Sequence, residues 1–487
     1  MRTEFKLFLT IWLVYAVYVT PAGGVTPNRY VDLVHSIVNE GRFAIDTYQE
    51  NTIDKSYYNG HYYAGALPGP AFLAVPAYVV FKGIYALIPQ PVKDIASGIE
   101  SFKKQTLNDS SFYGRVDNVE FFLSQGFLVI FVVAVFSALT GVLFFKILKL
   151  MSADETTSYL LTFAYAFGTV LFWNSTVFFE QVFTIFFALA SFYMLLRLRA
   201  TQFRNRELVI AGFLAGSAFL VEFSGALVAA AIFVYAVLKI KYWRVLYYVL
   251  GAVLPVLILA GYNYSLFGNP LSTPYQHLML TGFQEVMGEG FGGVTYPHLD
   301  RFIGLLISPE RGILVFAPIT ILGLFGLLMP SKLRSEFKNE AIFLGLAVAV
   351  SFLFVSSFRG WNAGNGFGPR YLSFAIPFML LPAAFVLNRS NLRVGLSLGS
   401  VSVLINWAGA QYGFAPNYYA HVADLLSKGP STPIFEAVAS HTVNANPVLE
   451  SIITYRPFLA GLLAILLASV VSVTWLWSGR VQKTVER

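Results

Sequence analysis

The sequence has no cysteine and few charged residues. Asp, Glu, Lys and Arg make up 12% of the 487 residues, about half of the share in soluble domains. The absence of cysteine excludes disulfides, thiol catalysis and cysteine-ligated metal sites. Hydrophobic residues make up 56% and Phe alone occurs 46 times, which is more apolar surface than a soluble domain of this size can bury. The composition therefore indicates a polytopic integral membrane protein.

The common short motifs of soluble enzymes are also missing. We find no Walker loop, dinucleotide fingerprint, zinc-protease motif or nucleophile elbow. The net charge of +7 would suit nucleic-acid binding. However, the basic residues stand in short clusters between apolar runs, and such clusters set the orientation of membrane proteins. We therefore predict no nucleic-acid partner.

Apolar runs that could cross a bilayer dominate the chain. A spanning helix needs roughly 20 mostly apolar residues. The sequence predicts an all-α membrane fold of about 12 transmembrane helices, within a range of 11–13. Glu222 divides the run 208–238, which is too long for one span. The twelve predicted spans are 5–20, 121–147, 157–173, 183–198, 208–221, 226–238, 245–262, 313–328, 341–357, 371–387, 394–412 and 458–477.

A thirteenth apolar run, 67–88, contains three prolines and Lys82, which disfavour the interior of a spanning helix. If this run does not cross, one side of the membrane holds 19 basic and 7 acidic residues, and the other holds 14 basic and 19 acidic residues. The positive-inside rule then places both termini in the cytoplasm. We therefore predict that 67–88 is an interfacial or re-entrant segment on the outer face.

The predicted topology puts the long loops on one face of a single transmembrane domain covering 1–487. These are a first outer loop (21–120) with amphipathic or re-entrant helices, a second large outer loop (263–312) and a glycine-rich outer loop (358–370). The cytoplasmic loops are short. Because loops carry binding and catalytic residues more often than spans do, we expect the protein to work at the outer face.

The first outer loop carries candidate acids and bases. Residues 28–39 have the apolar spacing of a short amphipathic helix that ends at Gly41. Asp46, Asp54 and His61 follow, and they are candidates for an acid, a base or metal ligands. An ordinary polar loop would also contain such residues, and on residue types alone that interpretation is favoured.

Arginines mark the later outer loops. Arg359 and Arg370 bracket the glycine-rich loop, and Arg311 lies at the end of the second large loop. Planar guanidinium groups suit phosphate, although arginines beside a membrane also extend to lipid headgroups. Glu180 and Glu222 stand at the outer ends of apolar runs. Acids there are functional candidates, or they favour the helix dipole.

The order of these parts resembles the GT-C superfamily of membrane glycosyltransferases, which includes the protein O-mannosyltransferases and the lipid A aminoarabinose transferases. The first-loop stretch from Asn28 to Gly69 is similar to a group of bacterial and archaeal carrier-dependent glycosyltransferases. Two later segments also match that group: the Ser-Pro-x-Arg-Gly segment followed by a proline, at 308–318, and the Trp-x-x-Gly and Gly-Pro-Arg-Tyr segment at 361–371. The motif match covers roughly a quarter of the chain.

The sequence departs from this family in two places. Relatives usually carry an acid just before the Arg-Tyr of the first helix, where this chain has Thr26-Pro27-Asn28. Relatives often have an Asp-Lys pair before the Pro-Gly, where this chain has Gly65-Ala66. The resemblance therefore implies either that Asp54 or Asp46 supplies the base, or that the protein is a member without catalytic activity.

The resemblance implies a cell-membrane glycosyltransferase that moves a sugar from a polyprenyl-phosphate donor to a glycan, lipid or protein acceptor at the outer face. A non-catalytic assembly protein and a lipid or solute transporter are the alternatives. The resemblance leaves open whether a divalent cation takes part. We expect Asp54, then Asp46, as catalytic residues and Arg370, Arg359 and Arg311 as ligands of the donor phosphate. The expected cavity-lining residues are His61, Tyr62, Tyr63, Glu180, Glu222 and Trp361.

Overall fold

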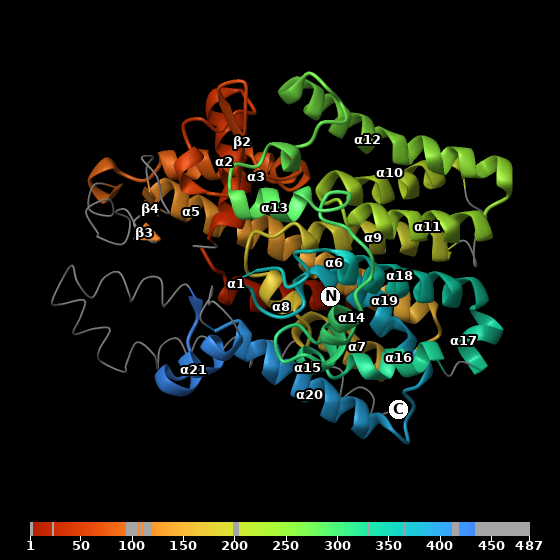
Figure 1. The fold of residues 1–487 in the computed structure, drawn as a ribbon. Coiled ribbons are helices and arrows are strands. Elements are labelled where there is room, and N and C mark those ends of the chain that lie inside the picture. Colours follow the sequence, from red (N-terminus) through yellow and green to blue (C-terminus); the bar gives the residue numbers. More distant parts are fainter. Residues whose placement is uncertain are drawn as a thin grey trace.

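The computed structural model describes residues 3–21, 24–93, 106–107, 110–111, 118–197, 204–328, 331–364, 366–411 and 418–433. Helices make up most of this part of the chain (Figure 1). The α-helices are α1 (Thr3–Val17), α2 (Val25–Glu40), α3 (Gly69–Ala86), α5 (Asn118–Leu128), α6 (Ala134–Leu150), α7 (Glu155–Phe167), α8 (Leu171–Asn174), α9 (Gln181–Leu196), α10 (Asn205–Val221), α11 (Gly225–Lys239), α12 (Val245–Phe267), α13 (Thr281–Gly288), α14 (Leu299–Ile307), α15 (Ile313–Phe316), α16 (Thr320–Leu328), α17 (Ser331–Glu336), α18 (Lys338–Ser357), α19 (Ile376–Leu380), α20 (Leu392–Gly409) and α21 (Tyr418–Lys428).

The strands are few and short. They form two antiparallel pairs, β1 (Lys55–Tyr58) with β2 (His61–Ala64) and β3 (Thr106–Leu107) with β4 (Ser110–Ser111). The predicted all-α class is therefore confirmed.

Each of the first eleven predicted spans contains helix, and the twelfth, 458–477, lies outside the described residues. Some spans are interrupted. Pro318 separates α15 from α16, and a π-helical segment, Val129–Val133, joins α5 to α6. Within the described residues, five helices are long and apolar enough to cross a membrane: Gly69–Ala86, Val119–Leu150, Tyr242–Phe267, Lys338–Ser357 and Leu392–Gly409. The number of twelve spans stays a prediction.

Helix α3 is one of these five, because its 18 residues meet the length and hydropathy of a span. It nevertheless contains Pro76 and packs against α2 of the first loop. The prediction that 67–88 stays on the outer face is not tested by this arrangement.

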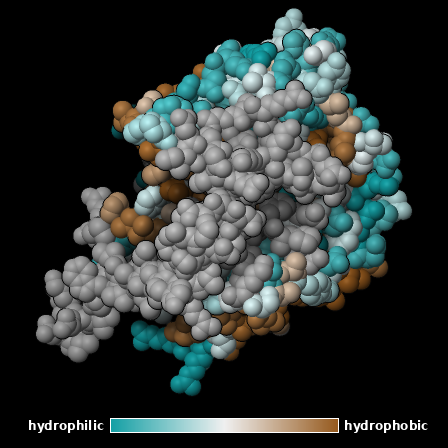
Figure 2. All heavy atoms as spheres, turned by 90° about the vertical axis from the view of Figure 1, so that its left-hand side faces the viewer, coloured by the Kyte–Doolittle hydropathy of each residue, from teal (hydrophilic) through white to brown (hydrophobic). Residues whose placement is uncertain are grey.

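Helix α12 carries an exposed apolar face of the kind that suits contact with lipid. Leu246, Leu250, Leu254 and Leu257 are 51% to 60% exposed and recur at helical spacing along one face. Such a stripe would be unstable in water but is solvated by acyl chains. Apolar side chains also reach the surface on the face seen in Figure 2.

On its other face α12 packs closely against α10, and the two helices lie side by side at one edge of the molecule (Figure 1). Glycines make this approach possible. A Cβ atom at Gly212 would overlap the carbonyl oxygen of Tyr248, and one at Gly251 would overlap that of Val209. Small residues at contact positions are a common basis of helix association in membranes.

The described part of the predicted first outer loop folds into α2, the β1–β2 hairpin and α3. The predicted end of the first helix is confirmed, since Gly41 adopts the left-handed conformation (φ 68°) that favours glycine and caps α2. The hairpin turns at Asn59 and Gly60, which both have positive φ, as an Asn-Gly turn requires.

The predicted second outer loop is hydrogen-bonded to this hairpin. The Ser56 hydroxyl donates a hydrogen bond to the Pro274 carbonyl (2.6 Å), and the Met279 N–H donates to the Lys55 carbonyl (3.0 Å). Two loops that are more than 200 residues apart in the sequence therefore come together. Their junction lies close to the buried charges described next.

Candidate active site

A buried ion pair joins α2 to the segment that precedes β1. The Arg29 Nη1 lies 2.5 Å from the Asp54 Oδ2, and both side chains are 7% exposed. Arg29 also donates to the Gly65 carbonyl (3.2 Å). A side chain at Gly65 would collide with Asp54, since its Cβ would stand 2.8 Å from the Oδ1. Gly65 is one of the two residues found where relatives have Asp-Lys, and here it leaves room for Asp54.

Further acids stand beside this pair. Glu180 Oε1 lies 3.6 Å from the Arg29 Nη2, and the Glu180 Oε2 is buried without a hydrogen-bond partner among the described residues. Glu222 is buried and within electrostatic range of Glu180, and it accepts a hydrogen bond from the Thr184 hydroxyl (3.2 Å). Burial raises the pKa of Asp54, and the Arg29 charge opposes this shift.

Arg370 is the second cation of this region. It is 7% exposed and is close enough to act electrostatically on both Asp54 and Glu222. Its guanidinium lies over the Phe179 ring (4.8 Å) and donates to the Ala363 carbonyl (3.2 Å). Within the described part of the chain it forms no ion pair, and its Nε has no hydrogen-bond partner. Among the residues that the structure describes, Arg370 is thus a buried cation without a direct counterion.

These five residues, Arg29, Asp54, Glu180, Glu222 and Arg370, are called the buried charge cluster below. They come from five separate stretches of the sequence. Tyr275, on the second large loop, is also within electrostatic range of Arg29, Asp54 and both glutamates. The loop that is fastened to the hairpin therefore brings a phenol to the cluster.

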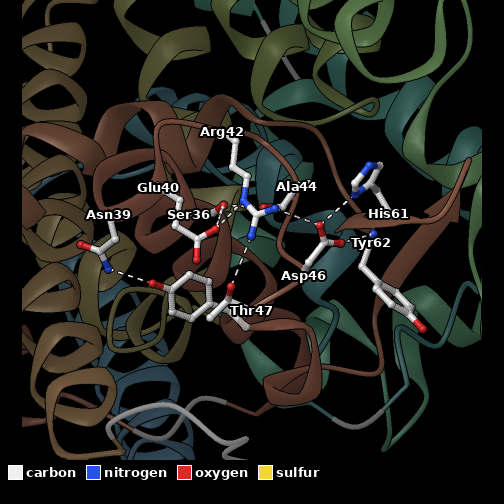
Figure 3. A network of polar contacts seen from close by, with 10 residues as sticks. Ser36, Asn39, Glu40, Arg42, Ala44, Asp46, Thr47, His61 and Tyr62 are labelled. Carbon is white, nitrogen blue, oxygen red and sulfur yellow. Dashed lines mark hydrogen bonds and ion pairs between the residues drawn. The ribbon is translucent and has the colours of Figure 1, made fainter.

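Asp46 lies in a different, more exposed network (Figure 3). Its Oδ2 is 2.9 Å from the His61 Nδ1 and 3.1 Å from the Arg42 Nη1, and its Oδ1 accepts the Tyr62 N–H (2.8 Å). Arg42 also pairs with Glu40 (2.6 Å). Asp46 thus ties the end of α2 to the hairpin, and His61 belongs to this network and not to the buried charge cluster.

The other predicted site residues have varied surroundings. Arg359 is 43% exposed and pairs with Glu289. Trp361 is half-buried against Gly304 of α14. Tyr63 is buried against the Phe267 ring (5.7 Å), and Tyr62 lies beneath the Lys55 ammonium (5.1 Å).

The Arg311 guanidinium donates hydrogen bonds to backbone carbonyls of the glycine-rich loop. The described residues contain no group of three or more His, Cys, Asp or Glu side chains that could hold a metal ion.

The sequence reasoning missed Arg29 as a member of the site. The residue belongs to the Asn28-Arg29-Tyr30 motif, so the signal was present, but a helix arginine beside a membrane is usually assigned to the surface. It also missed Asp32, which is fully buried with its Oδ1 accepting from the Asn51 amide (2.9 Å). Burial raises the pKa of Asp32 well above its ordinary value.

Asn28, which stands where relatives have an acid, belongs to the same buried network. Its amide donates to the Asn51 carbonyl (2.8 Å) and accepts from the Gln125 amide (3.1 Å). This position therefore serves the packing of α2 on α5.

No protein-family model matches the chain, and no curated protein matches it in sequence. Solved structures with similar folds include ArnT from Cupriavidus metallidurans in the apo state, with 17% identity and a TM-score of 0.47 over 83% of this chain and 62% of that chain. The same protein bound to undecaprenyl phosphate gives 15% identity and a TM-score of 0.48 over 96% of this chain and 76% of that one.

The Archaeoglobus fulgidus oligosaccharyltransferase in complex with Zn and sulfate gives 13% identity and a TM-score of 0.44, over 91% of this chain and 55% of that one. These proteins are GT-C fold members, the superfamily that the sequence motifs resemble. The similarity assigns no activity and no residue role to this chain.

Proposed function

We propose that this protein is a glycosyltransferase that moves a sugar from a polyprenyl-phosphate donor to an acceptor at the outer face of the membrane. The observation that carries this proposal is the state of Arg370. A buried guanidinium without a counterion is costly, and an anionic ligand would remove much of that cost. A phosphate is the anion that a guanidinium matches best.

The acids of the cluster supply the second half of the chemistry. Asp54 is the proposed base, because its carboxylate is within electrostatic range of Arg370 and burial raises its pKa toward the range useful for proton transfer. The acceptor hydroxyl oxygen would bond to the anomeric carbon as the bond from that carbon to the phosphate oxygen breaks. The hydroxyl proton would pass to Asp54, and the phosphate would leave with the bonding electrons.

Arg370 would stabilise the charge on the leaving phosphate. Arg29 would hold Asp54 in place through Oδ2. Glu180 and Glu222 would contact the sugar or the acceptor hydroxyls from the same side. Asp46 is the second candidate for the base, but its exposed pairing with His61 and Arg42 gives it a weaker claim.

The topology proposed with this function places the loops 21–120, 263–312 and 358–370 outside and both termini in the cytoplasm. A lipid donor then has its tail in the bilayer, its phosphate at headgroup depth and its sugar among these loops. The acceptor is a glycan, a lipid or a protein.

Purified protein in liposomes tests the proposal. It would be given radiolabelled sugars on polyprenyl phosphates, beginning with undecaprenyl phosphate, and a panel of acceptors. We expect transfer by the wild type and a loss of about 10²- to 10³-fold in Arg370→Gln and in Asp54→Asn. Arg393→Gln, an exposed residue of α20, is the matched control and should keep full activity.

Absence of transfer across the whole panel would contradict the enzyme and favour the assembly protein. Movement of the labelled lipid across the bilayer without transfer would favour the transporter.

A further inference from the structure

The Arg311 side chain forms several hydrogen bonds with the backbone of the glycine-rich loop. Its Nη1 donates to the carbonyls of Glu310 (3.0 Å), Gly366 (2.9 Å) and Gly368 (3.4 Å). Its Nε and Nη2 donate to the carbonyls of Asn362 and Gly364. All three guanidinium nitrogens are therefore engaged by backbone oxygens.

The pattern of acceptors has a simple geometry. The carbonyls of the even-numbered residues from 362 to 368 point toward Arg311. The carbonyl of Ala363 instead accepts from the Arg370 Nη2 (3.2 Å). The two arginines thus bind alternate carbonyls of the same short loop, and Arg370 begins the helical segment that follows it.

The loop needs contacts from outside itself to keep this shape, because its backbone is unusual. Ala363, Gly364 and Gly368 all have left-handed φ, at 56°, 59° and 64°. The left-handed conformation is strained for a residue with a Cβ atom, such as Ala363. Glycines lose the most conformational entropy of any residue when they are ordered. The contacts with the charged Arg311 oppose both costs.

We propose that Arg311 is a positioning residue, which fixes the loop 362–368 and thereby holds Arg370 toward the buried charge cluster. The role in phosphate binding rests on the proposed function. Arg311 is then no ligand of the donor phosphate, because its nitrogens are already occupied. The carbonyl oxygens offset the positive charge of Arg311. The guanidinium of Arg370 can therefore lie within electrostatic range of it.

Hydrogen–deuterium exchange of the full-length protein tests the positioning directly. Arg311→Lys keeps the positive charge but loses the planar fork that reaches several carbonyls. We expect exchange in residues 358–370 to rise about tenfold or more in Arg311→Lys and in Arg311→Gln, and the labelling of Arg370 by phenylglyoxal to become faster. Arg370→Lys should leave loop exchange near the wild-type rate, because the Arg370 side chain donates a single hydrogen bond to the described residues of the loop. Arg393→Gln should match the wild type in every measurement.

Binding of undecaprenyl phosphate is measured in parallel, at a temperature where every variant is folded. We expect affinity to fall about tenfold or more in Arg311→Lys, with no rescue from the retained charge, and to fall likewise in Arg370→Lys. Unchanged loop exchange in Arg311→Lys would overturn the inference, and so would a loosened loop with unchanged affinity. If the wild type binds no polyprenyl phosphate while the Arg311 variants loosen the loop and expose Arg370, the positioning role stands and the proposed function falls.

Discussion

At the scale of single residues, the main feature is the pairing of charges away from water. Arg29 and Asp54 are both buried, so their ion pair must offset the loss of hydration. Arg370 has no such partner among the described residues. On the proposed function, Arg29 and Asp54 form a structural pair and Arg370 is the cation that binds the ligand.

A double-mutant cycle on Arg29 and Asp54 tests the pair. Removing one partner leaves the other charge buried, so Arg29→Met should lower the free energy of unfolding by about 3–5 kcal/mol. The double variant Arg29→Met/Asp54→Leu should lose clearly less than the sum of the single changes. Denaturation in detergent measures all three.

The exposed pair of Arg42 and Asp46, 3.1 Å apart, is the control for this cycle. Its coupling should stay at or below about 1 kcal/mol, because water screens exposed charges. Additive losses at Arg29 and Asp54 would contradict a stabilising pair.

His35 should make the protein sensitive to acid. The imidazole is buried on α2, next to the Ser124 hydroxyl (2.9 Å), and burial lowers its pKa from 6.5 to about 3, with a smaller effect from the Lys82 charge. Between pH 6.5 and about pH 3, His35 is protonated in the unfolded chain but not in the folded chain. The contribution of His35 to the free energy of unfolding is therefore fully present above pH 6.5. It falls by about 1.4 kcal/mol per pH unit as the pH drops through this window.

The comparison with His35→Gln isolates this effect. The difference in unfolding free energy between pH 7 and pH 5 should be about 2 kcal/mol larger in the wild type than in the variant. Equal pH slopes for the two proteins would show that His35 is not the acid-sensitive group.

At the scale of secondary-structure elements, close helix contacts depend on glycine. Where α10 contacts α12, backbone atoms of one helix occupy the space that a Cβ atom at Gly212 or Gly251 of the other would need. The same α12 carries Gly261, whose Cβ would meet nothing within 4 Å. One helix thus offers a tight position and an open position for comparison.

Gly251→Ala should push α12 away from α10 and destabilise the protein by about 1–3 kcal/mol, the usual cost of overpacking. Gly261→Ala should be neutral or slightly stabilising, since alanine favours helix and nothing obstructs it. Thermal unfolding in detergent compares the two variants. A loss in Gly261→Ala equal to that in Gly251→Ala would contradict the packing argument.

At the scale of the whole molecule, the side of the membrane on which each loop lies decides what the buried charge cluster can reach. The chain has no native thiol, so single cysteines report topology without background. Tyr57→Cys lies before α3 and Val92→Cys lies after it, and both positions are exposed.

We expect Tyr57→Cys and Val92→Cys to react with a membrane-impermeant thiol reagent from outside the cell. Lys149→Cys, at the end of α6, should react only from the cytoplasm, because basic clusters remain inside. Labelling of the first two positions from opposite sides would show that α3 crosses the membrane, and the predicted orientation would then be wrong.

Much of the fold could be predicted because hydropathy is a local property. The ends of most predicted spans lie within a few residues of the helix ends, and Gly41 ends α2 as expected. Breaks such as the one between α15 and α16 were missed, because a single proline in an apolar run does not show whether the helix bends or stops. The site was harder to predict. Asp54 and Arg370 were chosen in advance, whereas Arg29 was not, because its role depends on a partner 25 residues away.

The sequence by itself determined that this protein suits a membrane, that it is helical, and which functional groups it carries. It contains no thiols, it has few charges, and its arginines and carboxylates stand beside apolar runs. Only the tertiary structure decided how those groups are divided. It placed Asp54 with Glu180, Glu222 and Arg370 in the buried charge cluster, left Asp46 with His61 near the surface, and turned Arg311 toward backbone carbonyls. The physical reason is that an ion pair or a hydrogen bond needs atoms within a few ångströms of each other, and packing of distant segments sets that separation.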